Sequence, residues 1–185
     1  PVEEGQRGGL TKFGVNVVKR MEEMNMLIDV SHLNDEGFWD VVKFTNKPFI
    51  ASHSNSRTLH GRMRNLTDEQ IKAIADRNGV MGINAYKNIA GVREGENPIS
   101  RLADHVEYMV NLVGANHVGY GFDLCNSYYN SELKFKFEPH DSDSLSSHAE
   151  AVLLTEELLR RGISQEDCKL IMGGNFYKVF SDILA

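Results

Sequence analysis

Three residues that can bind a metal or move a proton each end a short apolar segment of the sequence. His32 ends MLIDVSH, His53 ends PFIASH and Asp123 ends HVGYGFD. An ionisable side chain that closes a buried strand is unfavourable unless it has a partner. Singly, each has a structural explanation, because a strand-end histidine is often hydrogen-bonded and an aspartate often caps a turn. Together, two imidazoles and a carboxylate suit zinc or a similar divalent ion.

The elements that must position these side chains alternate along the chain. We expect buried strands at 26–32, 48–53, 79–84 and 117–123. We expect helices at 11–25, 35–45, 67–77, 100–113 and 146–161, a short one after Ser164, and a last one at 175–184. This alternation predicts an α/β fold with a parallel sheet. The functional face of such a sheet lies at the carboxyl ends of its strands, so the three side chains should converge there.

The segments that follow the strands hold further candidates. Arg57, Arg62 and Arg64 come after His53, and are either solvated loop charge or a clamp that grips a substrate carboxylate in two-point fashion. The loops 85–98 and 124–145 would shape a pocket over the strand ends. Cys125 is interpreted as a packing residue. His105 and His148 lie on expected helices and are interpreted as surface residues or as neighbours of a site.

Composition excludes several classes of function. The chain has 185 residues, 20 basic and 26 acidic, and a net charge of −6, which argues against binding to a nucleic-acid backbone. Two cysteines make no disulfide framework, so a reducing compartment and a cytoplasmic location are expected. No apolar run approaches the roughly 18 residues of a membrane span. The first residue is Pro1, so we expect that the numbering starts inside a longer chain or that an N-terminal part has been removed.

Five segments in order carry a resemblance to a known family. They read GLTKFGVNVVKRMEEMNMLIDVSH, PFIASHSNSR, RMRNLTDEQIKAIADRNGVMGIN, HVGYGFD and GGNFYKVF. This series resembles the membrane (renal) dipeptidase family, peptidase family M19, from about Leu10 to Phe180. The combination is far more specific than any one of the motifs.

The resemblance implies a metal-dependent hydrolase on a TIM-like (β/α)₈ barrel, with a binuclear zinc centre that cleaves dipeptides. His32 and His53 match the two histidine ligands of one zinc ion. Arg64 matches the arginine that binds the terminal carboxylate of the substrate. Asp123 matches the aspartate that handles the proton of the reacting water and of the leaving amine.

The sequence also departs from the family pattern. The His-x-Asp pair and the bridging glutamate of the family have no counterpart in residues 1–185, and a complete barrel needs about 250 residues. We therefore expect a single domain, 1–185, that forms the second half of the barrel. It should lack activity by itself and should need either a missing N-terminal half or a homo-oligomer. The alternatives are a related metallo-amidohydrolase of small amides and a non-catalytic truncated fragment.

Overall fold

The computed structural model describes residues 6–125 and 142–184. Its strands are β1 (Ile28–Asp29), β2 (Phe49–Ile50), β3 (Met81–Ile83) and β4 (Val118–Tyr120). β1 pairs with β2 and β3 pairs with β4, both in parallel, and a parallel bridge between Ala51 and Met81 joins the two pairs. The strands therefore follow one another in chain order, which confirms the predicted parallel α/β arrangement. Each regular strand is shorter than predicted, because the chain leaves the ladder before the polar residues that close each segment.

The helices fall mainly where the sequence predicts them. They are α1 (Lys12–Glu23), α2 (Asp35–Phe44), α3 (Asp68–Asp76), α4 (Lys87–Ala90), α5 (Pro98–Val113), η2 (Ala115–His117), η3 (His148–Glu150), α7 (Ala151–Arg160), α8 (Gln165–Lys169), η4 (Leu170–Gly174) and α9 (Asn175–Leu184). Several details differ from the prediction. The segment expected as a loop at 85–98 contains α4, and α5 begins at Pro98 because the Asn97 side chain caps it.

None of the helices within 6–125 and 142–184 is long and apolar enough to cross a membrane.

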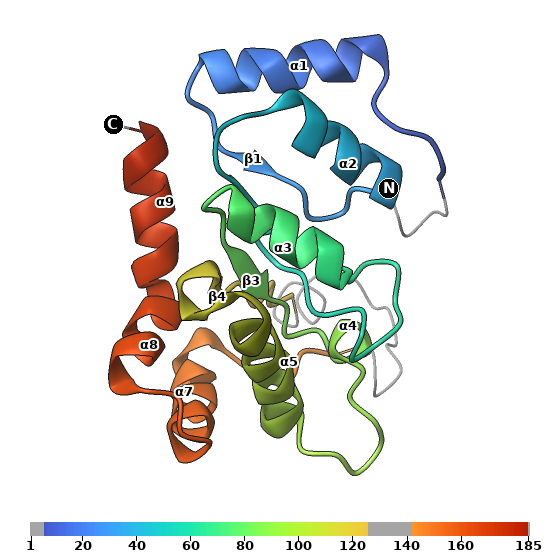
Figure 1. The fold of residues 1–185 in the computed structure, drawn as a ribbon. Coiled ribbons are helices and arrows are strands. Elements are labelled where there is room, and N and C mark those ends of the chain that lie inside the picture. Colours follow the sequence, from blue (N-terminus) through green and yellow to red (C-terminus); the bar gives the residue numbers. More distant parts are fainter. Residues whose placement is uncertain (1–5, 126–141, 185) are drawn as a thin grey trace.

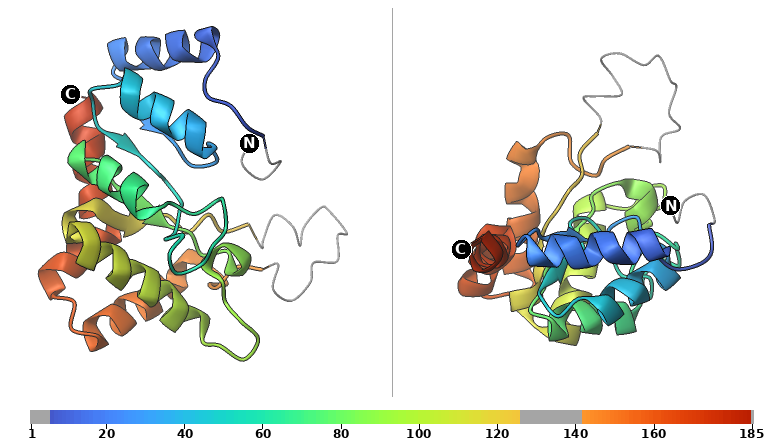
Figure 2. Two further views of the ribbon diagram at one scale, coloured as in Figure 1. Left: turned by 45° about the vertical axis from the view of Figure 1, so that its right-hand side comes forward. Right: turned by 90° about the horizontal axis from the view of Figure 1, so that it is seen from above.

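The two faces of the sheet are covered by different helices. Figure 1 shows α2, α3 and α5 in a row from top to bottom, and their apolar side chains pack with Phe49 and Met81 in the main core. A smaller cluster joins Ile50 and Val80 to α9, which lies to the left of this row in Figure 1 and in the right-hand view of Figure 2. Because side chains alternate across a strand, Ser52 lies on the same face as Ile50, two residues closer to the carboxyl ends.

Two glycines allow the backbone after β2 to lie directly against β3 and β4. A Cβ atom at Gly82 or at Gly121 would collide with the carbonyl oxygen of Ser52 and with the Cα atom of the other glycine. Gly119 is needed for a different reason, since a Cβ there would come within 2.6 Å of the Phe176 ring. The GYG sequence at 119–121 therefore has a packing role.

This close approach predicts a sharp difference between two glycine substitutions. Gly121→Ala should lower the free energy of unfolding by about 1–3 kcal/mol or more. The atoms that the new Cβ meets belong to the backbone of Ser52 and Gly82 and cannot move aside as a flexible side chain can. Gly61→Ala is the matched control, since nothing lies within 4 Å of a Cβ at Gly61 and its φ is not in the left-handed region. Urea unfolding of the complete protein measures both. Equal stabilities for the two variants would contradict the packing account.

His105 is buried in the core, which corrects its interpretation as a surface residue. It lies on α5 with a relative exposure of 0%. Its Nδ1 accepts the backbone N–H of Ser56 at 3.2 Å, and its Nε2 donates to the carbonyl of Ala90 at 2.9 Å. Burial lowers the pKa of His105 to about 4. The neutral ring thus connects α5 to the segments that follow β2 and β3.

The low pKa of His105 makes stability depend on pH. The folded-state pKa of about 4 lies below the unfolded value of 6.5, so the neutral form is favoured in the native state. The stabilisation is complete above pH 6.5 and is lost as the pH falls from 6.5 toward 4. Between pH 7 and about pH 4.5, the wild type should lose about 2 kcal/mol more than His105→Gln, which cannot titrate.

Urea unfolding at both pH values measures how much unfolding free energy each protein loses between them. The variant should be less stable at pH 7, because an amide cannot replace both hydrogen bonds of the ring. Parallel losses in the two proteins would show that His105 is not the group responsible.

Candidate active site

The structure brings the two predicted histidines together. The Nε2 atom of His32, after β1, lies 2.9 Å from the Nε2 atom of His53, after β2, and the two ring centroids are 5.0 Å apart. The Oδ2 atom of Asp123, after β4, lies 3.7 Å from His53 Nε2. All three groups therefore meet at the carboxyl ends of the strands, as the parallel arrangement requires.

Two of these three residues have a strained backbone. His32 has a φ of 72° and Asp123 has a φ of 57°, in the left-handed region that non-glycine residues seldom adopt. The other described non-glycine residues with positive φ are Asn25 and Asn78, and both follow the ends of helices, where this conformation is common. Strain of this kind concentrates at functional sites, because surrounding contacts hold the residue in place.

His53 is held from three directions. Its backbone N–H donates to Ser31 Oγ at 3.1 Å, and its carbonyl accepts from Arg64 Nη2 at 3.0 Å. Its ring Nδ1 lies 2.6 Å from Ser52 Oγ. Burial lowers the pKa of His53 below its usual value, and the nearby Arg64 and His32 lower it further, against the opposing effect of Asp123. At neutral pH the ring is therefore uncharged and has a lone pair that can bind a cation.

Asn84 is a site residue that the sequence analysis missed. Its Nδ2 donates to Asp123 Oδ2 at 3.3 Å, while its Oδ1 accepts the backbone N–H of Tyr86 at 2.7 Å. Its own backbone exchanges hydrogen bonds with the side chain of Asn55. The signal was available, because the third apolar segment ends in Asn84 just as the others end in His32, His53 and Asp123.

A cavity of about 300 Å³ opens beside these groups. It is lined by His32, Arg64, Asn84, Tyr86, Ile89, Asp123, Cys125 and Asp143. The expected contribution of the loop 85–98 comes from Tyr86 and Ile89. Most of the other expected loop, at positions 126–141, lies outside the described residues. The cavity is therefore lined mainly by polar groups from the segments that follow β1, β2, β3 and β4, together with Asp143 and with Tyr86 and Ile89 at α4.

The three arginines after His53 have separate roles. Arg57 forms two parallel hydrogen bonds with the carboxylate of Asp35, both at 2.8 Å, and Arg62 bonds the side chain of Asn88. Arg64 is buried, with 8% exposure, lines the cavity and donates from Nη1 to Ser54 Oγ at 2.8 Å. The cationic cluster predicted from the sequence is thus divided, and Arg64 is its member at the site.

Cys125 also lines the cavity but has the wrong protonation state for a nucleophile. Burial raises the pKa of its thiol, and the carboxylates of Asp123 and Asp143 raise it further. The thiolate is the reactive form of cysteine, so a protonated thiol is a weak nucleophile. We therefore assign no reaction to Cys125.

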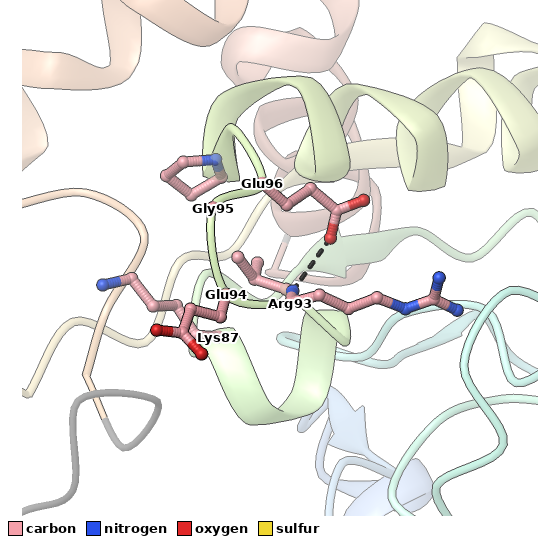
Figure 3. Close-up of a pocket in the computed structure, with 7 residues that line it drawn as sticks. Lys87, Arg93, Glu94, Gly95 and Glu96 are labelled. Atoms are coloured by element: carbon pink, nitrogen blue, oxygen red, sulfur yellow. Dashed lines mark hydrogen bonds between the residues drawn. The ribbon is translucent and has the colours of Figure 1, made fainter.

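A larger cavity, of about 480 Å³, lies away from the strand ends. Figure 3 shows its lining by Lys87 and by the loop between α4 and α5, where Glu96 accepts the backbone N–H of Arg93 at 2.9 Å. It has two cations, Lys87 and Arg93, and two carboxylates, Glu94 and Glu96, and it includes none of the predicted site residues. We therefore locate the candidate site at the strand ends.

The histidine pair has the donors that zinc requires. Two imidazole nitrogens 2.9 Å apart can both bond one ion at the usual Zn–N distance of about 2.0–2.1 Å. Within 6–125 and 142–184, no group of three or more His, Cys, Asp or Glu side chains is arranged to hold a metal. The described residues thus fit one part of a metal site and do not complete it.

A parallel β/α sheet with imidazoles and a carboxylate at its carboxyl edge has the layout of barrel-type hydrolases. Residues 1–184 match the model of the membrane dipeptidase family, peptidase family M19, and the chain belongs to this family. The resemblance seen in the sequence is confirmed, and the family defines a class of hydrolases.

The chain is similar to proteins that are longer than itself. It is 30% identical over 182 residues to the dipeptidase aclJ of Aspergillus oryzae, covering 98% of this chain and 40% of that protein. The structure of a dipeptidase described as a metallopeptidase of family M19 matches with a TM-score of 0.79 and 23% identity, over 95% of this chain and 49% of that one.

A metallopeptidase of Rhodobacter sphaeroides, liganded with a phosphinate mimic of the dipeptide L-Ala-D-Ala, matches with a TM-score of 0.76 and 24% identity. Here the match covers 95% of this chain and 48% of the other. The chain thus spans about half the length of these solved structures, as a half-barrel would.

Proposed function

We propose that the complete protein is a zinc-dependent dipeptidase that hydrolyses the amide bond of dipeptides. The observation that carries the proposal is the meeting of His32 Nε2 and His53 Nε2 at 2.9 Å, with Asp123 Oδ2 3.7 Å from His53. Family membership supports the reaction class. The phosphinate bound to the Rhodobacter sphaeroides relative supports the substrate class.

His32 and His53 would hold one zinc ion of a binuclear centre. A catalytic zinc usually has three protein ligands, so the proposal requires further ligands from outside the described residues. When bound, zinc polarises a carbonyl and lowers the pKa of its water to about 7. The chain's own contribution is a pair of imidazoles whose Nε2 atoms are held 2.9 Å apart.

Asp123 would transfer the proton. Its carboxylate lies beside the histidine pair and is oriented by the amide of Asn84 at 3.3 Å. We propose that it accepts a proton from the attacking water and donates it to the nitrogen of the departing amine. Proton transfer by a positioned group typically contributes a factor of about 10²–10⁴ to the rate.

Arg64 would select for dipeptides. It lines the same cavity as His32 and Asp123, so a carboxylate bound there lies a short distance from the scissile bond. A guanidinium has five N–H donors in a planar fork, which lets it bind protein acceptors and a substrate carboxylate at once. This position fits the amide bond next to a free terminal carboxylate, as in a dipeptide, and excludes the internal amide bonds of a longer peptide.

Asp123→Asn tests the proposed reaction. The amide keeps the shape of the carboxylate, and asparagine tolerates the left-handed φ of 57°. It cannot accept the proton, so kcat for dipeptides should fall by about 10²–10⁴-fold while bound zinc changes little. The assay is dipeptide hydrolysis by the complete protein, with zinc measured by mass spectrometry.

Asp76→Asn, at an exposed position on α3, is the matched control and should retain full activity. A kcat above a tenth of the wild-type value in Asp123→Asn would contradict the assigned role. Absence of dipeptide hydrolysis in the zinc-loaded wild type would contradict the proposed function itself.

Arg64→Lys tests the carboxylate clamp. A single ammonium cannot reproduce the two-point fork, so KM for dipeptides should rise about tenfold or more. Substrates whose carboxylate is amidated should be affected far less, because they have no group for the fork to bind. Steady-state kinetics on matched free-acid and amide substrates measures the difference. Equal losses on both would mean that Arg64 has a structural role and does not bind the substrate carboxylate.

A further inference from the structure

A chain of hydrogen bonds connects the carboxylate of Asp29, on β1, to the ring of His53. The Oδ2 atom of Asp29 bonds Ser52 Oγ, and Ser52 Oγ lies 2.6 Å from His53 Nδ1. The other oxygen, Oδ1, accepts the backbone N–H groups of Ser31 and Ser52, both at 3.0 Å. The carboxylate is thus fixed by two strands and presents one oxygen to the serine hydroxyl.

The chemistry of these groups sets the direction of the chain. An ionised carboxylate only accepts hydrogen bonds, and a hydroxyl has one proton to donate. The Ser52 hydroxyl must therefore donate to Asp29 Oδ2, which leaves its lone pairs facing the ring. The contact between Ser52 Oγ and His53 then needs a proton on Nδ1. A neutral ring protonated at Nδ1 has its lone pair on Nε2, the atom that faces His32.

We propose that Asp29 is a positioning residue that acts through Ser52 to hold His53 as the Nδ1–H tautomer, so that Nε2 can bind a metal. Neutral histidine in water prefers the opposite tautomer, so the hydrogen bonds select the less common form. The structural part of this inference stands on the three side chains alone, and the metal-binding part rests on the proposed function. Partners of this kind fix the tautomer and the orientation of metal-binding histidines in many proteins.

The structure also explains why an aspartate is needed at position 29. In Asp29→Asn, the amide oxygen must stay with the two backbone N–H groups, because an NH₂ group cannot accept them. The NH₂ group then faces Ser52 Oγ and donates to it. The serine hydroxyl must in turn donate to His53 Nδ1, which moves the ring proton to Nε2. A substitution that hardly changes shape therefore reverses the whole chain.

The direct test is the tautomer of His53 in the complete, metal-free protein at a pH where the ring is neutral. Long-range ¹H–¹⁵N spectra of histidine-labelled protein distinguish a protonated from an unprotonated ring nitrogen, and His53→Gln assigns the signals. The wild type should show a protonated Nδ1 and a bare Nε2. Asp29→Asn and Ser52→Ala should both show the opposite tautomer, whereas Ser52→Thr, which keeps the hydroxyl, should behave as the wild type.

Ser31→Ala is the matched control, because Ser31 Oγ contacts the backbone N–H of His53 and leaves its ring alone. It should keep the wild-type tautomer. A wild-type ring protonated at Nε2 would overturn the proposal, and so would an unchanged tautomer in either Asp29→Asn or Ser52→Ala. The wild-type spectrum decides the question even if one variant does not fold.

Zinc affinity provides a second readout that separates this inference from the proposed function. Competition of the complete protein with a chelator should show about 10–100-fold weaker zinc binding in Asp29→Asn and Ser52→Ala, with Ser52→Thr close to the wild type. A reversed tautomer with unchanged zinc affinity would overturn the role of His53 as a ligand. That result would contradict the proposed function and leave the hydrogen-bond chain intact.

Discussion

The site depends on one steric constraint, the close contact of the Ser52 backbone with Gly82 and Gly121. The carbonyl of Ser52 occupies the space that a Cβ atom on either glycine would need. This contact draws the end of β2 against the ends of β3 and β4 and sets His53 beside Asp123. The parallel pairing of β1 with β2 then brings His32 to the same atom of His53, Nε2. Backbone packing, which is rigid, therefore determines the spacing of the reactive groups.

Around this contact, neighbouring polar groups fix the orientation of each reactive side chain. Arg64 and Ser31 hold the backbone of His53, Ser52 holds its ring, and Asn84 holds the carboxylate of Asp123. The backbone of Asp123 itself is left-handed, a strain that occurs at functional sites where surrounding contacts hold a residue in place. A site preorganised in this way needs little rearrangement when substrate binds, which is the condition for efficient electrostatic catalysis.

The parallel strand order and the convergence of His32, His53 and Asp123 were predictable because they follow from local patterns. Apolar segments that end in His32, His53 and Asp123 indicate buried strands of a parallel sheet. Parallel pairing then places the carboxyl ends of these strands, and the three side chains, at the same edge. Asn84 was missed because a neutral amide has no chemistry of its own until a neighbour such as Asp123 is placed beside it. The spacing of residues along one strand does not show which groups on other strands will face it.

Two other outcomes depended on tertiary structure in the same way. His105 lies on an amphipathic helix, and its burial is favourable only because Ser56 and Ala90 supply one donor and one acceptor in the right places. The arginines after His53 are equivalent in the sequence, but Asp35 binds Arg57 while Arg64 lies in the cavity. Local propensity cannot distinguish such residues, because what differs between them is the partner.

The most direct test of the account is a crystal structure of the complete protein with zinc, with data collected on both sides of the zinc absorption edge. The account predicts an anomalous peak at bonding distance, about 2.0–2.1 Å, from both His32 Nε2 and His53 Nε2. A peak bonded to neither ring, or to only one of them, would contradict the claim that these two histidines share a metal ion.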